Sequence, residues 1–309
     1  MSAERLLTRR EAVLRLGAAS LFGLGLWPGC HTPRATSGGG RAFRFLAVND
    51  LHHASAACDE WFAALVRQMR GHEGIEFVLL LGDLADTGEE ADLAAIRDHF
   101  RTLRLPFYSV IGNHDYLTAT DRRAYEQIFP RQLNYEFEHR GWQFVGIDST
   151  EGTSWEKTRV QPATLRWLDD RLPKLSRHRP LVLFTHFPLG ADVRMRPLNA
   201  DEVLERFLDF NLRGVFGGHF HGYTARRFQN AEVLTNRCCS FLRANHDGTT
   251  EKGYWLVTAA DGTLAREFIA FKGLGNATAS VGVSAPFGNA TGSNGALTDV
   301  LSFPLRGPG

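Results

Sequence analysis

Short, continuously apolar segments recur through the middle of this chain, and most of them end in Asp, His or Asn residues. They cover residues 43–48, 77–81, 107–111, 144–147, 181–184 and 215–216. Continuous rather than alternating apolar character is typical of strands that are buried on both faces of a sheet. Amphipathic segments lie between them, at residues 60–70, 90–103, 163–175 and 200–210. This alternation predicts an α/β fold in which helices cover the sheets.

From Tyr223 onward the helical periodicity stops. The segments that follow are strand-like and are separated by turns rich in Asn, Asp and Gly, and they cover residues 224–229, 231–237, 254–259 and 264–270. Such spacing is typical of β-hairpins. The second half of the chain therefore adds hairpins to the sheet structure.

The polar residues after the apolar segments form five short motifs. These read Asn-Asp-Leu-His at 49–52, Gly-Asp-Leu-Ala-Asp at 82–86, Gly-Asn-His-Asp at 112–115, Thr-His at 185–186 and Gly-Gly-His-Phe-His at 217–221. In open α/β sheets, ligands bind outside the carboxyl ends of the strands. Asp and His supply oxygen and imidazole ligands that suit Zn, Fe or Mn. The sequence therefore predicts a metal site at this edge of the sheets.

These five motifs, in this order and each after a predicted strand, resemble those of the calcineurin-like metallophosphoesterase superfamily over about residues 43 to 271. The resemblance implies a four-layer α/β/β/α sandwich, in which two mixed β-sheets are flanked by helices and the metal site lies at the C-terminal ends of the strands. It implies a metal-dependent hydrolase of phosphate esters, either a phosphodiesterase or a phosphomonoesterase, that uses a hydroxide activated by a dinuclear metal centre. Asp86 stands where the purple acid phosphatases have a tyrosine ligand, so the pattern is closer to the compact bacterial phosphodiesterases and phosphatases.

The resemblance also implies the site residues. Two metal ions, each of them Fe, Mn or Zn, would be held by seven side chains: Asp50, His52 and His221 on the first ion, Asn113, His186 and His219 on the second, and Asp83 between them. His114 would be the catalytic histidine at the leaving-group oxygen. The Asp86 carboxylate would accept a hydrogen bond from its other ring nitrogen and fix the tautomer.

Three further side chains are candidate substrate contacts: Tyr116, Arg194 and Arg196. The alternative for Tyr116 is packing in the core, and for the two arginines a solvated loop. Asp115 is expected to support its own loop, and Asp148 to form a turn. The histidines outside the motifs are expected at the surface, at positions 53, 72, 99, 139, 178 and 246.

The charge balance narrows the class of partner. The 35 basic and 34 acidic residues leave a net charge of +1, which does not favour a general nucleic-acid binder. We therefore expect a small phosphorylated substrate. One alternative is a sugar-nucleotide or pyrophosphate hydrolase with the same site. An alternative of another class is a non-catalytic scaffold with the metallophosphoesterase fold, but the complete set of motif residues favours an enzyme.

The two ends of the chain differ from its middle. Residues 1–37 are typical of an export signal and linker, because Arg9 and Arg10 precede an apolar segment too short to cross ~30 Å of hydrocarbon. The pair resembles a twin-arginine signal, so we expect an exported protein, either periplasmic or anchored as a lipoprotein through a lipid at Cys30. Cleavage at Ala35–Ser37 is the competing site, and an amphipathic helix is the alternative interpretation. Residues 41–272 would form the metallophosphoesterase domain, and residues 273–309 a flexible Gly-rich tail.

Overall fold

The structure is a computed structural model that describes residues 41–271 and residue 273. The predicted export segment, including Cys30, and the predicted tail beyond Gly273 lie outside the described residues. Within residues 41–271, no helix combines the length and the apolar character that a membrane span needs.

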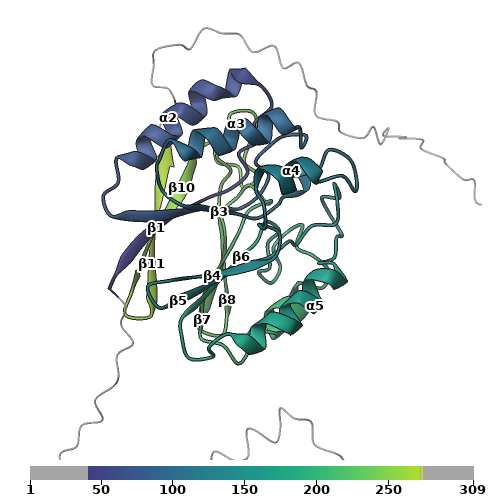
Figure 1. Cartoon of the computed structure of the whole chain (residues 1–309), viewed down its shortest axis with the longest axis vertical. Coiled ribbons are helices and arrows are strands. Elements are labelled where there is room, and N and C mark those ends of the chain that lie inside the picture. The colour runs from purple at the N-terminus through teal and green to yellow at the C-terminus, as the bar shows by residue number, and fades with distance from the viewer. Residues whose placement is uncertain (1–40, 272, 274–309) are drawn as a thin grey trace, which may run out of the picture. The chain divides into compact units, whose positions relative to one another are not determined.

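The described residues form two mixed β-sheets (Figure 1). The first sheet has the order β11-β10-β1-β2-β3. Its strands are β1 Phe43–Val48, β2 Ile75–Leu80, β3 Phe107–Ser109, β10 Lys252–Ala260 and β11 Thr263–Phe271. In this sheet β1, β2 and β3 are parallel, while β10 is antiparallel to both of its neighbours.

The second sheet has the order β4-β5-β6-β7-β9-β8. Its strands are β4 Tyr135–His139, β5 Trp142–Gly146, β6 Leu181–Phe184, β7 Leu212–Gly217, β8 Thr224–Phe228 and β9 Ala231–Thr235. Here β5, β6, β7 and β9 are parallel, and the two edge strands β4 and β8 are antiparallel to their neighbours. The predicted α/β fold with two mixed sheets is therefore confirmed.

Helices cover the outer faces of both sheets. They are α2 Asp59–Arg70, α3 Glu90–Arg101, α4 Arg123–Ile128, α5 Pro162–Arg171 and α6 Ala200–Glu205, together with the short 3₁₀ helices η1 Ala56–Cys58, η2 Asn113–Asp115 and η3 Leu172–Lys174. Figure 1 shows α2 and α3 over the first sheet and α5 beneath the second. On α2 the buried residues Phe62, Leu65, Val66 and Met69 follow the i, i+3, i+4, i+7 spacing of a helix with one buried face.

The alternation of side chains along β1 explains how the layers pack. Phe43 and Phe45 point into a largely aromatic core between the two sheets, where the rings of Phe45 and Phe77 stack with centroids 4.9 Å apart. Leu46 and Val48 point the other way, into the core beneath α2 and α3. Both faces of the strand are thus buried, which is why its sequence is apolar without interruption.

Several element boundaries differ from the sequence prediction. The helix predicted at 163–175 ends as α5 at Arg171, because Pro173 has no amide hydrogen with which to continue the hydrogen bonds of the helix, and the chain goes on as the 3₁₀ helix η3. The helix predicted at 200–210 ends at Glu205 and continues as turns with three-residue hydrogen bonds, such as Phe207 N to Leu204 O at 2.9 Å. Strand β4 was not predicted, because an edge strand with Glu136 and Glu138 has no continuous apolar segment.

Candidate metal centre

The five motifs meet at one edge of the molecule. The loops that carry them follow β1, β2 and β3, which are parallel in the first sheet, and β6 and β7, which are parallel in the second. Within each sheet the carboxyl ends of parallel strands lie at the same edge, and the two sheets present these edges to one another, so Asp50 of the first sheet and His221 of the second become neighbours. The structure brings all seven predicted ligand side chains together there, from Asp50 to His221.

Two groups of potential ligands share Asp83. Asp50, His52, Asp83 and His221 form the first group, and Asp83, His186 and His219 form the second. One Asp83 oxygen, Oδ2, lies 3.6 Å from His52 Nε2, and the other, Oδ1, lies 3.3 Å from His186 Nε2. The amide oxygen of Asn113 lies 3.2 Å from His186 Nε2 and so belongs to the second group. A carboxylate that presents one oxygen to each group has the geometry that a bridging ligand requires.

The four histidines each have one ring nitrogen engaged away from the centre. His186 Nδ1 donates to the Leu81 carbonyl at 2.8 Å, and His221 Nδ1 donates to the Ala244 carbonyl at 3.2 Å. His219 Nε2 donates to the Trp155 carbonyl at 2.7 Å. In its neutral form each imidazole has one N–H, so the other nitrogen of each ring then directs a lone pair at the centre.

His52 completes this pattern through a carboxylate. Its Nδ1 lies 3.2 Å from Asp86 Oδ1, while its Nε2 lies 3.2 Å from His221 Nε2. Two imidazole nitrogens that face each other at this distance, beside buried carboxylates, require a proton or a cation between them. The donor set of buried His, Asp and Asn side chains therefore fits divalent metal ions.

Burial and mutual charge set the pKa values of this cluster. Burial acts to raise the pKa of Asp50, but the positive charge of His221 lowers it below its ordinary value. Burial lowers the pKa of His52 to about 4 and that of His219 to about 3, so both rings are neutral near pH 7. Burial opposes protonation of His186 as well, yet Asp83 raises its pKa to about 9. An ion that binds at His186 must therefore displace a proton.

The backbone of the centre is strained and tightly held. Asp50, His52, Asp83, His219 and His221 all have φ between 47° and 64°, a region that costs a residue other than glycine about 1–3 kcal/mol. The loops after β1 and β2 restrain each other through Leu51 N to Asp83 O at 2.8 Å and His52 N to Asp83 O at 2.9 Å. The chain thus maintains an unfavourable conformation at the residues that point into the centre.

Glycines make room for the charged side chains. A Cβ at Gly112 would lie 2.1 Å from Asp83 Oδ1, and a Cβ at Gly218 would lie 2.7 Å from Asp50 Oδ2. Both glycines therefore allow a backbone to lie directly against a carboxylate. Asp115 supports the same loops, because its Oδ1 accepts from Leu84 N and Ala85 N and its Oδ2 from Gly112 N, at 2.7–2.9 Å. The prediction that Asp115 supports its loop is confirmed.

The predicted partnership of His114 and Asp86 needs a correction. His114 Nδ1 donates to the backbone carbonyl of Asp86 at 2.7 Å, not to its carboxylate. The Asp86 carboxylate instead contacts His52 and accepts from Arg243, with Nε at 2.8 Å and Nη2 at 2.6 Å from Oδ1. The carboxylate is drawn away because a guanidinium offers it two charge-assisted hydrogen bonds, whereas a carbonyl suffices to orient the His114 ring.

The candidate substrate contacts lie in different surroundings. Tyr116 is 6% exposed, and its hydroxyl contacts Thr150 Oγ1 at 2.9 Å and Arg122 Nη1 at 3.1 Å, as the packing alternative expects. Arg196 pairs with Asp201, with Nη2 and Oδ1 2.6 Å apart. Arg194 is exposed and lies over the ring of Phe220, the residue between the predicted ligands His219 and His221 in the sequence. Of these three side chains, Arg194 has the position that suits a substrate contact.

The structure also places near the centre two residues that the sequence did not predict there. Arg243 brings a positive charge beside Asp86, and the His246 ring stacks on that of His221 with centroids 5.0 Å apart. Neither residue lies in a motif, and Arg243 is 157 positions from Asp86. His53 was expected at the surface, and this was wrong: it is 3% exposed, with carboxylates on both ring nitrogens. Asp148, expected to form a turn, accepts from Thr150 N at 2.9 Å.

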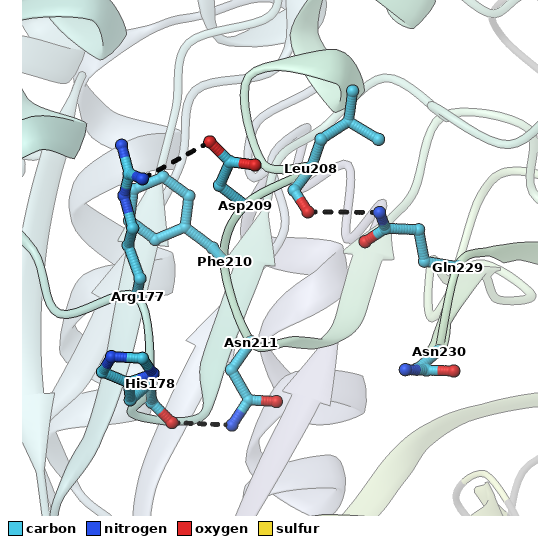
Figure 2. Close-up of a pocket in the computed structure, with 8 residues that line it drawn as sticks. All are labelled: Arg177, His178, Leu208, Asp209, Phe210, Asn211, Gln229 and Asn230. Carbon is cyan, nitrogen blue, oxygen red and sulfur yellow. Dashed lines mark hydrogen bonds and ion pairs between the residues drawn. The ribbon is translucent and has the colours of Figure 1, made fainter. Parts of the chain in front are cut away.

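A cavity of about 540 Å³ lies at the opposite end of the second sheet. Figure 2 shows its lining, which includes Asn211, just before β7 begins, and Gln229 and Asn230, between β8 and β9. Asn211 Nδ2 donates to the His178 carbonyl and Gln229 Nε2 to the Leu208 carbonyl, so these amides are engaged with the chain itself. The cavity is remote from the carboxyl ends of the strands and plays no part in the centre.

Comparison with known proteins agrees with this geometry. The family model for calcineurin-like phosphoesterases matches residues 43–223. A 3′,5′-cyclic-nucleotide phosphodiesterase of Nostoc is 26% identical over 183 residues, which are 57% of this chain and 67% of that protein. A probable cyclic nucleotide phosphodiesterase of Rhodopseudomonas palustris is 28% identical over 47% of this chain and 57% of its own length. A probable glycerophosphodiester phosphodiesterase of Arcobacter nitrofigilis is 24% identical over 52% of this chain and 62% of its own length.

Solved structures share the fold at low sequence identity. A purple acid phosphatase from yellow lupin superposes with a TM-score of 0.55 at 15% identity, over 75% of this chain and 52% of that one. GAP50, the anchor in the inner membrane complex of Plasmodium, gives a TM-score of 0.55 at 14% identity, over 75% of this chain and 86% of that one. These likenesses concern the fold alone.

Proposed function

This chain belongs to the calcineurin-like phosphoesterase family, and from that premise we propose that it hydrolyses a small phosphodiester of the cyclic-nucleotide class. The observation that carries the proposal is the complete donor set, in which the four histidines keep a ring nitrogen for the centre and Asp83 presents one oxygen to each group. Two relatives with similar sequences, a 3′,5′-cyclic-nucleotide phosphodiesterase and a probable glycerophosphodiester phosphodiesterase, support a phosphodiester substrate.

The donor set would hold two ions, the first at Asp50, His52 and His221, the second at Asn113, His186 and His219, with Asp83 shared. When bound, two divalent ions supply a nucleophilic hydroxide near neutral pH and stabilise negative charge on the phosphoryl oxygens. The centre is largely buried, with Asp50 0% and Asp83 1% exposed, so electrostatic interactions there are only weakly screened by water.

His114 would protonate the leaving-group oxygen. Its Nδ1–H is fixed by the Asp86 carbonyl at 2.7 Å, so the proton it transfers must be on Nε2. Its backbone N–H donates to Asp83 Oδ1 at 2.9 Å, and its ring lies 4.8 Å from that of His52. The residue is thus held at the edge of the centre without being part of either group that shares Asp83.

Two side chains near the centre suit a nucleotide substrate. Arg243 is 36% exposed and adds a positive charge that attracts an anionic phosphodiester. The backbone carbonyl of Trp155 accepts a hydrogen bond from His219, which places this residue beside the centre. Trp155 is 54% exposed. An exposed indole at this position offers a surface on which a nucleobase stacks.

The proposal is tested by comparing substrates on the Mn-loaded protein. We expect turnover of 3′,5′-cyclic AMP and bis-p-nitrophenyl phosphate to exceed that of p-nitrophenyl phosphate. His114→Ala should retain its metal ions and lose roughly 100-fold or more in kcat for cyclic AMP, which has a poor leaving group. Near-normal turnover of cyclic AMP by this variant would refute the role of His114. Metal binding without turnover of any ester would favour the scaffold alternative.

Trp155 provides a test of the substrate class. Trp155→Ala should raise KM for cyclic AMP about tenfold, since base stacking contributes roughly 1–3 kcal/mol, and leave KM for glycerophosphoethanolamine unchanged. An equal change in KM for both diesters would show that the indole does not contact a base. Trp167→Ala, on the helix α5, serves as a control for loss of a tryptophan elsewhere.

We propose further that the protein is exported through its twin-arginine-like segment. The support is Arg9 and Arg10 before a short apolar segment in the sequence. Replacement of both arginines with lysine should retain the protein in the cytoplasmic fraction. Incorporation of labelled palmitate that is lost in Cys30→Ala would establish a lipid anchor, and an unlabelled mature protein would favour cleavage near Ala35.

A further inference from the structure

A second group of histidines and carboxylates lies outside the candidate metal centre. His53 follows β1, Asp59 is the first residue of α2, and Asp92 and His99 belong to α3. Asp59 Oδ1 lies 3.0 Å from His53 Nε2 and 2.9 Å from His99 Nε2. The potential ligand atoms of His53, Asp59 and His99 lie within 4.8 Å of one another. Side chains from three separate segments of the chain thus bring their potential ligand atoms together.

The ring of His53 is between two carboxylates. Its Nδ1 lies 2.7 Å from Asp92 Oδ1, and its Nε2 faces Asp59. A neutral imidazole has one N–H, so a ring that donates to Asp92 directs a lone pair at the Asp59 oxygen. His53 is 3% exposed, so water gives this arrangement little relief. A cation between the two atoms would satisfy both of them.

We propose that His53 Nε2, His99 Nε2 and the Asp59 carboxylate bind one divalent transition-metal ion, with Zn²⁺ as the best match. Imidazole and carboxylate ligands suit zinc, which accepts three protein ligands and a water molecule. Asp92 then has the role of the carboxylate that holds a ligating histidine in its orientation and tautomer.

The distances support this assignment. Two ligands at 2.0–2.1 Å from one ion at the tetrahedral angle lie roughly 3.3 Å apart. The observed separations of 3.0 Å and 2.9 Å need to grow by only about 0.3–0.4 Å. Asp59 is 48% exposed and His99 18% exposed, so the fourth position opens to solvent.

The ion would connect the outer helices to the catalytic loops. The backbone of His53 is bonded to the loop after β2, with His53 N to Leu84 O at 2.9 Å and Asp86 N to His53 O at 2.8 Å. An ion held also by Asp59 and His99 links α2 and α3 to this pair of loops. Its role is structural, since it adds a cross-link next to His52 without entering the centre.

Elemental analysis of zinc in the full-length protein tests the proposal. The wild type and the variants are equilibrated with micromolar ZnCl₂ and then freed of unbound ions. We expect His99→Ala and Asp59→Asn each to contain one zinc ion fewer per chain than the wild type. His178→Ala, which removes an exposed histidine elsewhere, should contain as many as the wild type. Equal zinc contents in all four proteins would overturn the proposal and leave a network of proton-linked ion pairs.

A second measurement keeps the proposal testable if a variant folds poorly. The Co²⁺-loaded wild type should show visible absorption typical of tetrahedral coordination that is absent from Asp59→Asn, and circular dichroism reports whether that variant is folded. Identical absorption in a folded variant would contradict the site. Turnover of bis-p-nitrophenyl phosphate is measured in parallel. A wild type that fails to hydrolyse this ester would count against the proposed function, whereas the difference in zinc content between the wild type and the variants would still support the zinc site.

Discussion

Gly112→Ala is the sharpest test of how the centre is built, because its effect is purely steric. The backbone of Gly112 has φ −104°, which alanine adopts without strain. A Cβ at this position would nevertheless lie 2.1 Å from Asp83 Oδ1 and 2.2 Å from Asp83 N. Both atoms must move by about 1 Å to reach ordinary contact. Asp83 N belongs to the backbone, and Asp83 Oδ1 is buried and accepts a hydrogen bond from His114 N at 2.9 Å, so neither moves easily.

The loss of stability expected for Gly112→Ala follows from the atoms that an added Cβ would displace. Overpacking of a close-packed site costs roughly 1–3 kcal/mol, and we expect the upper part of this range because a backbone nitrogen and a buried carboxylate are involved. Gly217→Ala is the matched control at the same edge of the sheets. Its Cβ would meet backbone oxygens at 3.4 Å and 3.6 Å, so it should be tolerated within about 1 kcal/mol.

Three measurements on the two variants decide the matter: the urea midpoint, the metal content and the turnover of bis-p-nitrophenyl phosphate. Gly112→Ala should lower all three, because displacement of Asp83 removes the ligand that both groups share. Gly217→Ala should resemble the wild type. If the two variants behave alike, the close approach of Gly112 to Asp83 does not control the centre, and the reasoning is refuted.

Three further predictions concern stability. Asp115→Ala leaves three buried N–H groups without their acceptor and should cost about 3–5 kcal/mol in urea unfolding, whereas a cost below about 1 kcal/mol would contradict these bonds. The pKa of Asp247 is lowered to about 2, because hydrogen bonds from Thr249 and the backbone of Tyr223 outweigh the opposing effect of burial. The Asp247 carboxylate therefore stabilises the fold above its ordinary pKa, and this contribution is lost as pH falls toward about 2. The melting temperature of Asp247→Asn should accordingly fall less than that of the wild type between about pH 4 and pH 2. Removal of the metal ions by a chelator should lower the melting temperature by several degrees, since Asp50 and Asp83 then lose their counter-charge, and Mn²⁺ should restore it.

The sequence was informative wherever the signal was local. Each apolar segment and the motif after it are contiguous, so the strands and the Asp and His residues at their ends were predictable together. The parallel arrangement brings together the motifs that belong to one sheet, whereas the contact between Asp50 and His221 also depends on how the two sheets stack. The edge strand β4 lacked this signal, because its residues Tyr135–His139 are half-buried and alternate in polarity.

Contacts between distant segments could not be predicted in this way. The pairing of Arg243 with Asp86 depends on how the loop after β9 folds back over the first sheet, which no spacing rule describes. The burial of His53 depends on α2 and α3 closing over it. His114 donates to the backbone carbonyl of Asp86 rather than to its carboxylate, because the carboxylate is occupied by Arg243. Which oxygen accepts from His114 thus depends on the position of Arg243.

The position of β1 in its sheet affects the order in which the protein can fold during synthesis. β1 lies between β2 and β10, and its residue Phe45 pairs with Val257. The seven predicted ligands all lie between residues 50 and 221, yet a nascent chain that stops before β10 leaves the strand leading to Asp50 with an open edge. Such a chain should fail to retain metal although it contains every ligand. Assembly of the centre therefore waits for β10 and β11 to emerge from the ribosome, so it does not begin as soon as His221, the last predicted ligand, has been synthesised.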